Sequence, residues 1–131
     1  MLNLTNINLK GIDFNGLNLE RVILKETNLT CSSFVFSNLK GSDMRGVNLE
    51  GVNLEGVNLE GANLEGANLE GANLICTKLV GSNLKGTNLK NTDLSRADIR
   101  FADLEGTDMT GAYIHNTIID AYFWFFYFRQ T

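Results

Sequence analysis

The sequence lacks several features that would assign it to a familiar class of protein. Among its 131 residues proline is absent, histidine occurs once and cysteine twice. The single imidazole, His115, excludes most metal sites and catalytic triads, because these need two or more such groups. The apolar run from Ala121 to Phe128 is far shorter than the roughly 18 residues of a membrane span. We therefore expect no metal, no cofactor, no catalysis and no insertion into a membrane.

A five-residue repeat takes the place of these features. From Val47 to Leu74 the chain reads GVNLE, GVNLE, GVNLE, GANLE, GANLE, GANL without a break in phase. Large apolar residues hold the central position of every repeat from Leu4 to Ile119, with no insertion or deletion. The absence of proline suits this pattern, since proline cannot donate to a continuous backbone ladder. One domain is therefore expected over residues 1–121.

A period of five fits neither a helix nor a strand. On a helix the central residues would drift about 140° per repeat, and on a strand they would alternate between faces. Both problems vanish if the backbone turns a corner once in every five residues, which brings each central residue inside. Glycine at the fifth position and asparagine before leucine are typical of such corners. The repeat therefore predicts a solenoid.

The small inward position, two residues before each central one, also carries information. It mostly holds alanine, serine or threonine, as a narrow interior requires. Bulkier residues occupy it near the start of the chain, at Leu2, Ile7, Ile12, Leu17 and Val22. The start is already in register, so no cap is expected at the N-terminal end.

The pattern A(D/N)LXX resembles that of the pentapeptide-repeat family. Residues 45–74 and 81–94 match it almost residue for residue, whereas the repeats at 22–26, 32–36 and 77–81 lack the Asn or Asp. The resemblance implies an all-β fold, a right-handed, four-sided parallel β-helix with twenty residues per coil. About six such coils would make a rod about 29 Å tall. The local turn stays open in the three irregular repeats.

Outward charges offer a partial test of the coil size. Residues twenty apart carry mostly opposite charges, as in Glu20, Lys40 and Glu60, whereas residues fifteen apart carry mostly like charges. Facing pairs of opposite charge stabilise a sheet, so the pattern argues against three sides. It does not separate four sides from five. A coil of twenty would also stack the rings of Phe14 and Phe34.

Residues 122–131 break the repeat with a run of aromatic side chains. Trp124 keeps the central phase and is expected to lie over Leu104. A solenoid exposes its core at both ends, so the segment predicts either a cap or a surface for end-to-end dimerisation. Some family members pair through their C-terminal ends, so the resemblance supports the second alternative. The residues concerned are Tyr122, Phe123, Trp124, Phe125, Phe126 and Phe128.

The two cysteines predict the compartment. On a four-sided rod Cys31 and Cys76 lie on different sides and more than two coils apart, beyond the roughly 7 Å between Cα atoms that a disulfide allows. We expect free thiols in a reducing cytoplasm. The start of the chain has no basic segment followed by an apolar run, so we expect no secretory signal.

The surface favours a non-catalytic rod that acts as a scaffold or binds a protein partner. Glutamates at 50, 55, 60, 65 and 70 fall on successive sides and are interpreted as a solvated exterior. Four outward apolar residues are either scattered, as on most surfaces, or form a small partner-binding patch. They are Val35, Phe36, Ile75 and Val80.

An alternative function comes from the resemblance, because some family members mimic DNA and bind a type II topoisomerase such as gyrase. A duplex about 29 Å long would carry about 17 negative charges at one per 1.7 Å. This chain has a net charge of only −4, with lysine and arginine interleaved among the acidic residues. Its acidity also argues against direct binding of nucleic acid.

Overall fold

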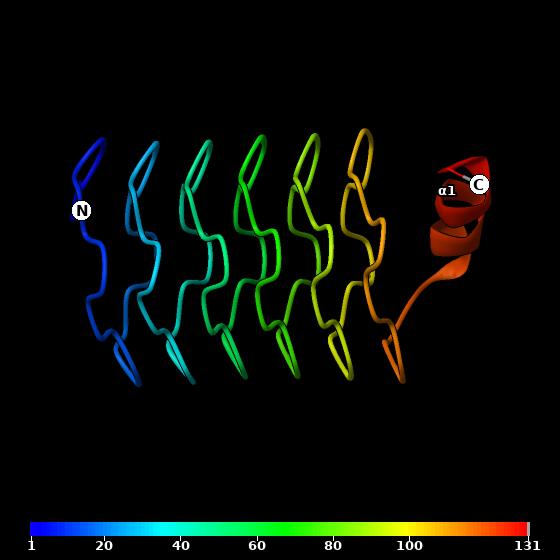
Figure 1. Ribbon diagram of the computed structural model, residues 1–131, viewed down its shortest axis with the longest axis horizontal. Helices are drawn as coiled ribbons and strands as arrows, with labels where there is room; N and C mark the ends of the chain where they lie inside the picture. The colour runs from blue at the N-terminus through cyan, green and yellow to red at the C-terminus, as the bar shows by residue number, and fades with distance from the viewer. Residues whose placement is uncertain (131) are drawn as a thin grey trace.

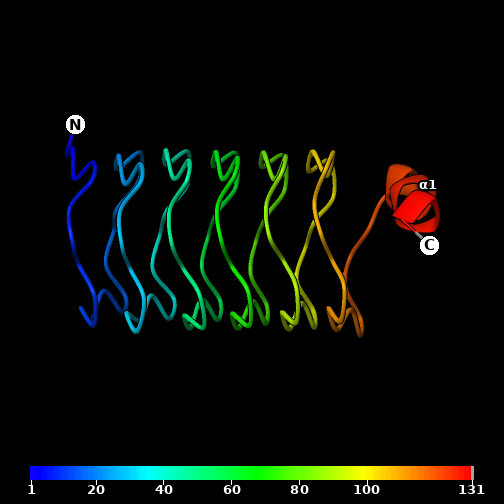
Figure 2. The ribbon, with the colours of Figure 1, turned by 45° about the horizontal axis from the view of Figure 1, so that its top comes forward.

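The chain forms a rod of stacked coils followed by one α-helix, as Figure 1 shows for the computed structural model. The structure describes residues 1–130, except for the side chains of Phe128 and Gln130. The coils follow one another along the rod from the N-terminus, and helix α1, Ala121–Gln130, lies beyond the last coil. A second view keeps the same order (Figure 2).

Each coil takes twenty residues, or four repeats. Parallel bridges join residue i to residue i + 20, from Asn3 with Ile23 to Asp98 with Ile118. Each bridge is a single residue long, because a corner interrupts every side of the coil. The parallel β-helix is therefore confirmed, and the spacing decides between the twenty and twenty-five residues that the charges left open.

The corners share one backbone geometry. Every fifth residue from Asn6 to Asn116 has a φ between 56° and 77°, whether or not it is glycine. The asparagine before each central residue supports the turn, as where the amide of Glu50 donates to the Asn48 Oδ1 at 3.2 Å. All three irregular repeats turn in the same way, with φ of 56° at Glu26, 57° at Phe36 and 66° at Gly81. The stacked coils therefore impose the corner even where Asn or Asp is missing.

The interior is a narrow apolar column. The central residues from Phe14 to Met109 are buried, apart from Leu19, which is half-buried. Phe14 and Phe34 stack as expected, with ring centroids 4.7 Å apart. Most threonine hydroxyls in the small position donate to the preceding coil, as from Thr77 to the carbonyl of Leu54 at 3.0 Å, whereas Thr92 donates to Leu89 of its own coil. The core therefore runs along the rod without a break.

Ion pairs follow the predicted spacing only in part. Lys40 lies 4.0 Å from Glu60, and Lys85 lies 3.8 Å from Glu105, each across one coil. Two arginines instead bind the aspartate two residues earlier in their own repeat. Arg45 bonds to Asp43 at 2.7 Å and Arg100 to Asp98 at 2.6 Å. These short pairs also fix the local turn.

The two arginine pairs predict that the protein loses part of its folding stability in acid. The hydrogen bond from Arg45 lowers the pKa of Asp43 below its usual 3.8, and Arg100 lowers the pKa of Asp98. Because the folded pKa lies below the unfolded one, this stability is present above pH 3.8 and is lost as pH falls through the folded value. Thermal melts from about pH 6 to about pH 2 measure the loss.

The matched control is Asp43→Asn, Asp98→Asn, since asparagine is the usual residue at this position. The variant keeps the turn but has no carboxyl to titrate. We expect its melting temperature to fall less between pH 4 and pH 2 than that of the original chain. Equal slopes for the two proteins would contradict the assignment.

The C-terminal segment corrects two expectations. The all-β assignment is wrong here, because residues 121–130 form α1, and Trp124 is not inward, since 47% of it is exposed. Phe123 is the buried residue instead, at 3% exposure. The helix begins because the Asp120 carboxylate accepts the amides of Tyr122 and Phe123, at 3.0 and 3.3 Å. A helical turn then replaces the corner and shifts the inward phase by one residue.

The described part of the chain contains no helix with the length and apolar character needed to cross a membrane.

Candidate functional site

The C-terminal end of the rod is built around Asp120. Its side chain caps α1 and also accepts the backbone amide of Phe101 from the previous coil, which ties the helix to the rod. Arg129 lies in the last turn, where a cation complements the helix dipole, and its guanidinium lies 5.2 Å from the centre of the Phe125 ring. Asp120 therefore anchors the start of the helix to the rod, and Arg129 stabilises its last turn.

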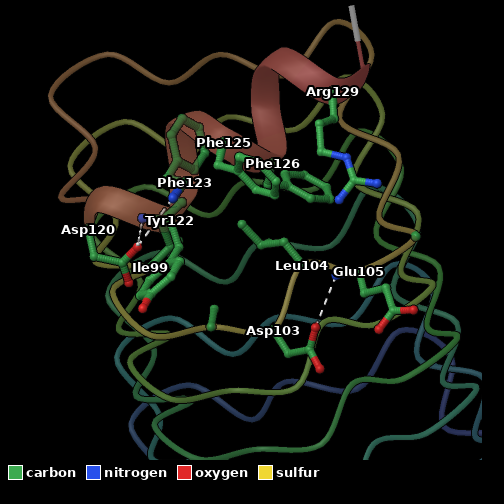
Figure 3. Close-up of a pocket in the computed structure, with 12 residues that line it drawn as sticks. Ile99, Asp103, Leu104, Glu105, Asp120, Tyr122, Phe123, Phe125, Phe126 and Arg129 are labelled. Atoms are coloured by element: carbon green, nitrogen blue, oxygen red, sulfur yellow. Dashed lines mark hydrogen bonds between the residues drawn. The ribbon is translucent and has the colours of Figure 1, made fainter.

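A cavity of about 580 Å³ separates α1 from the last coil. In Figure 3, Phe123 and Phe126 point from the helix toward Leu104, and Arg129 hangs over the same space. Asp103, Glu105 and Asp120 add carboxylates to the wall. The apolar part of the wall consists of Ile99, Ala102, Leu104, Phe123, Phe125 and Phe126.

The aromatic segment has one inward and one outward face. Phe123 is buried, and Phe126 and Tyr127 pack half-buried against the core. Tyr122, Trp124 and Phe125 are exposed. Residues of both faces were singled out from the sequence, including Phe128, whose side chain lies outside the described part of the structure. One face thus packs against the core, and the other is exposed.

The second candidate surface lies on one side of the rod. Phe36 is 70% exposed, and its ring lies over the next coil at Gly56, where an added Cβ would stand 2.4 Å from the ring. Cys76 occupies the same corner one coil further on and is also exposed. Val35 and Ile75, each one residue earlier, are half-buried. The structure therefore brings three of the four patch residues onto one side.

Val80, the fourth patch residue, lies on the next side, beside a shallow hollow of about 410 Å³. The hollow reaches Cys76 and so continues the patch around the corner. Lys78, Arg96 and Ile118 also line it, and the sequence analysis missed all three. A signal was available at Lys78, which replaces the usual Asn or Asp and still bridges to Asn58.

The other groups considered for chemistry lie apart. His115 is exposed and stacks on Tyr113, with ring centroids 5.9 Å apart. Cys31 and Cys76 are free and exposed, as predicted. Within residues 1–130, no three His, Cys, Asp or Glu side chains come together in a way that could hold a metal ion. The hydrogen bonds from Thr110 that lower the pKa of Asp108 belong to an ordinary turn.

Comparisons with known proteins point to one family. A family model described as pentapeptide repeats matches eight copies, over residues 3–41, 32–71, 48–86 and 72–111. No curated protein matches the chain. Solved structures that do match include Rfr23, a pentapeptide repeat protein from the cyanobacterium Cyanothece 51142. It shares 28% identity over 90% of this chain and 91% of its own, with a TM-score of 0.69.

Two further structures show the range of proteins with this architecture. A pentapeptide repeat protein from the thylakoid lumen of Arabidopsis thaliana shares 27% identity over 76% of this chain and 69% of its own, with a TM-score of 0.73. QnrB1, a plasmid-mediated fluoroquinolone resistance protein, covers 98% of this chain and 82% of its own, with a TM-score of 0.53. At 16% identity, that likeness concerns the fold alone.

Proposed function

The chain belongs to the pentapeptide-repeat family, and from that premise we propose that it is a non-catalytic rod that binds a protein partner through one side. The binding surface is the apolar patch formed by Val35, Phe36, Ile75 and Val80, extended by the neighbouring exposed Cys76. We take the rod to be right-handed, with about six coils, by likeness to the family. Its partner is a protein of the same compartment, for which we propose the cytoplasm.

Phe36 is the observation that carries the proposal. A phenylalanine side chain gains about 1.5–3 kcal/mol from burial, yet this ring is 70% exposed on a rod whose other outward corners are mostly glycine or polar. Gly56 leaves the space that the ring occupies over the next coil. Large exposed aromatic residues with small neighbours are typical of protein-binding surfaces.

The hollow beside the patch defines the chemistry of the partner. Lys78 and Arg96 bring two cations to the hollow, whereas Arg100 is already paired with Asp98. Glu60 also lines the hollow, but it lies 4.0 Å from Lys40 and is partly neutralised by it. Cys76, Val80 and Ile118 supply the apolar part of the lining. We propose that the bound segment places an apolar side chain in the hollow and a carboxylate against Lys78 or Arg96.

The exposed aromatic face of α1 supports a second contact. Tyr122, Trp124 and Phe125 make a surface that would be covered if two copies met at their C-terminal ends. We keep the C-terminal homodimer as part of the proposal, with Phe123 and Phe126 serving as the cap beneath it. Residues 122–131 would then act as both cap and interface.

Mimicry of DNA is less well supported as a function. Lysine and arginine interrupt the acidic columns, and the pairs of Lys40 with Glu60 and Lys85 with Glu105 neutralise part of the exterior. A duplex presents an unbroken row of phosphate charges instead. We therefore do not favour a role as a topoisomerase inhibitor for this chain.

The proposal is tested with Phe36→Asp, Val80→Asp. Both sites face outward, so the coil should still form, while two carboxylates replace the apolar surface beside the proposed carboxylate of the partner. We expect a partner captured from the native host by the original chain to bind at least about tenfold more weakly to the variant. Isothermal titration with the purified partner measures the change.

Two controls separate the patch from general effects. Glu65→Gln, Glu105→Gln alters the charge on another side and should leave binding unchanged. Gly56→Ala should displace the Phe36 ring. Gly51→Ala is its matched control, because Gly51 has the same φ of 67° and a Cβ added there meets nothing within 4 Å. Equal binding by the Phe36→Asp, Val80→Asp variant and the original chain would remove the proposal.

A further inference from the structure

The N-terminal end of the rod is an uncovered end of the core. Four aliphatic side chains stand there in the small inward position, and each is between 42% and 54% exposed. Further along the rod, the same position holds mostly alanine, serine or threonine and is buried. The larger side chains are thus concentrated at the end of the rod where no preceding coil covers them. The four residues are Leu2, Ile7, Ile12 and Leu17.

The backbone at this end has unused hydrogen-bonding groups. Inside the rod, Ile23 donates to the carbonyl of Leu2 at 2.9 Å and accepts from the amide of Leu4 at 2.7 Å, so both of its groups face the preceding coil. The equivalent residues of the first coil have no preceding coil. Within residues 1–130 no backbone partner meets the amide or the carbonyl of Asn3, Asn8, Asp13 or Asn18.

We propose that this end binds the same end of a second copy of the chain, in a closed two-fold dimer in which residue i faces residue 21 − i of its partner. An amide and a carbonyl of one residue that point to the same edge are what an antiparallel pair exchanges. The edge is therefore complementary to itself. This inference goes beyond the proposed partner patch and does not depend on it.

The opposite end explains why the partner is not stacked head to tail. A rod that brought its N-terminal edge to the C-terminal end of another copy would meet α1 and not an open coil edge. Head-to-head pairing covers the N-terminal edges of both copies at once, so this contact does not repeat along a chain of copies. The dimer is therefore the closed form of this contact.

The slope of the coil selects the register. One turn of twenty residues descends by one strand spacing, about 4.8 Å, so each successive side of the end lies about 1.2 Å lower. Two such slopes meet with an even gap only where the high side of one faces the low side of the other. That places Asn3 against the partner's Asn18, and Asn8 against the partner's Asp13. Every other quarter-turn leaves at least one side a full strand spacing out of step.

The charges at this end favour the same register. This register places Lys10 diagonally across from the partner's Asp13, and the two-fold symmetry makes the same pair twice in the dimer. Neither Lys10 nor Asp13 has an ion pair within residues 1–130. Two of the other registers bring like charges together. One sets Asp13 against the partner's Asp13, and another sets it beside the partner's Glu20. Shape and charge thus select one arrangement independently.

Sedimentation velocity tests the dimer in the 131-residue chain that carries Trp124→Ser, Phe125→Ser, which removes the aromatic contact at the other end. We expect a species of twice 14.5 kDa that dissociates on dilution. Adding Lys10→Asp should raise the dissociation constant about tenfold or more, because it sets two like-charged pairs across the contact. Lys90→Asp, on the same side of the rod but far from this end, should change nothing.

The charge exchange Lys10→Asp, Asp13→Lys should restore dimerisation, because it rebuilds the same pair in reverse. Lysine is compatible with the position of Asp13, since Lys78 occupies the equivalent site in the rod and still bridges to Asn58. A monomer at every concentration would overturn the inference. So would a dimer that Lys10→Asp leaves intact, or a charge exchange that fails to restore it, with folding checked by circular dichroism throughout.

Discussion

Removing one residue, Gly61, is expected to break the rod, whereas removing twenty, residues 51–70, leaves it folded. The single deletion puts every later residue one place out of phase with the bridges that join i to i + 20. If the later residues returned to their phase, the side of the coil that contains the deletion would have to form from four residues instead of five. Several buried leucines would then lose their places, at about 2–5 kcal/mol each, against a typical total stability of about 5–15 kcal/mol.

The longer deletion removes one whole coil and joins Glu50 to Gly71. Every remaining residue keeps its side of the rod, so the core and the bridges close as before, with one coil-to-coil contact fewer. Thermal unfolding followed by circular dichroism distinguishes the two proteins. Deleting residues 61–65 is the control, because it keeps the inward phase and should also fold. A cooperative melt near the original temperature after the Gly61 deletion would contradict the bridge pattern.

The second large effect is expected from Leu59→Ala. Leu59 is fully buried, and the bridges of Asn58 with Asn38 and Lys78 hold the backbone on both sides of it. The coil therefore cannot collapse into the cavity, and the cost should reach the upper part of the usual range of about 2–5 kcal/mol. Urea unfolding measures this free energy. The matched control is Leu9→Ala, at a half-buried site of the first coil, where we expect a clearly smaller loss. Equal losses at the two sites would show that the interior relaxes.

The interior could be predicted from the sequence because one rule repeats without a break. Once Leu54 and Leu59 both had to face inward, a corner between them followed, and every central residue took the same phase. The number of sides could not be obtained so directly, since the outward charges did not separate a coil of twenty residues from one of twenty-five. The bridges of the structure supplied it.

The C-terminal segment could not be predicted in the same way. Trp124 was placed inward by extending the five-residue phase past Asp120, where the corner no longer exists. The capping bonds from Tyr122 and Phe123 to Asp120 decide the outcome locally, and they start a helix. The hollow at Lys78 was missed for a related reason, because it depends on side chains from four successive coils that no linear pattern brings together.

Because the bridges are spaced twenty residues apart, the number of an outward residue gives its position on the rod. Dividing the difference between two outward positions by twenty gives their separation along the rod in steps of about 4.8 Å, and the remainder gives the side. Fluorophores, peptides or metal chelates attached at chosen positions would therefore sit at known heights on a chosen side. The same calculation gives the positions at which two binding loops can be grafted without contacting each other.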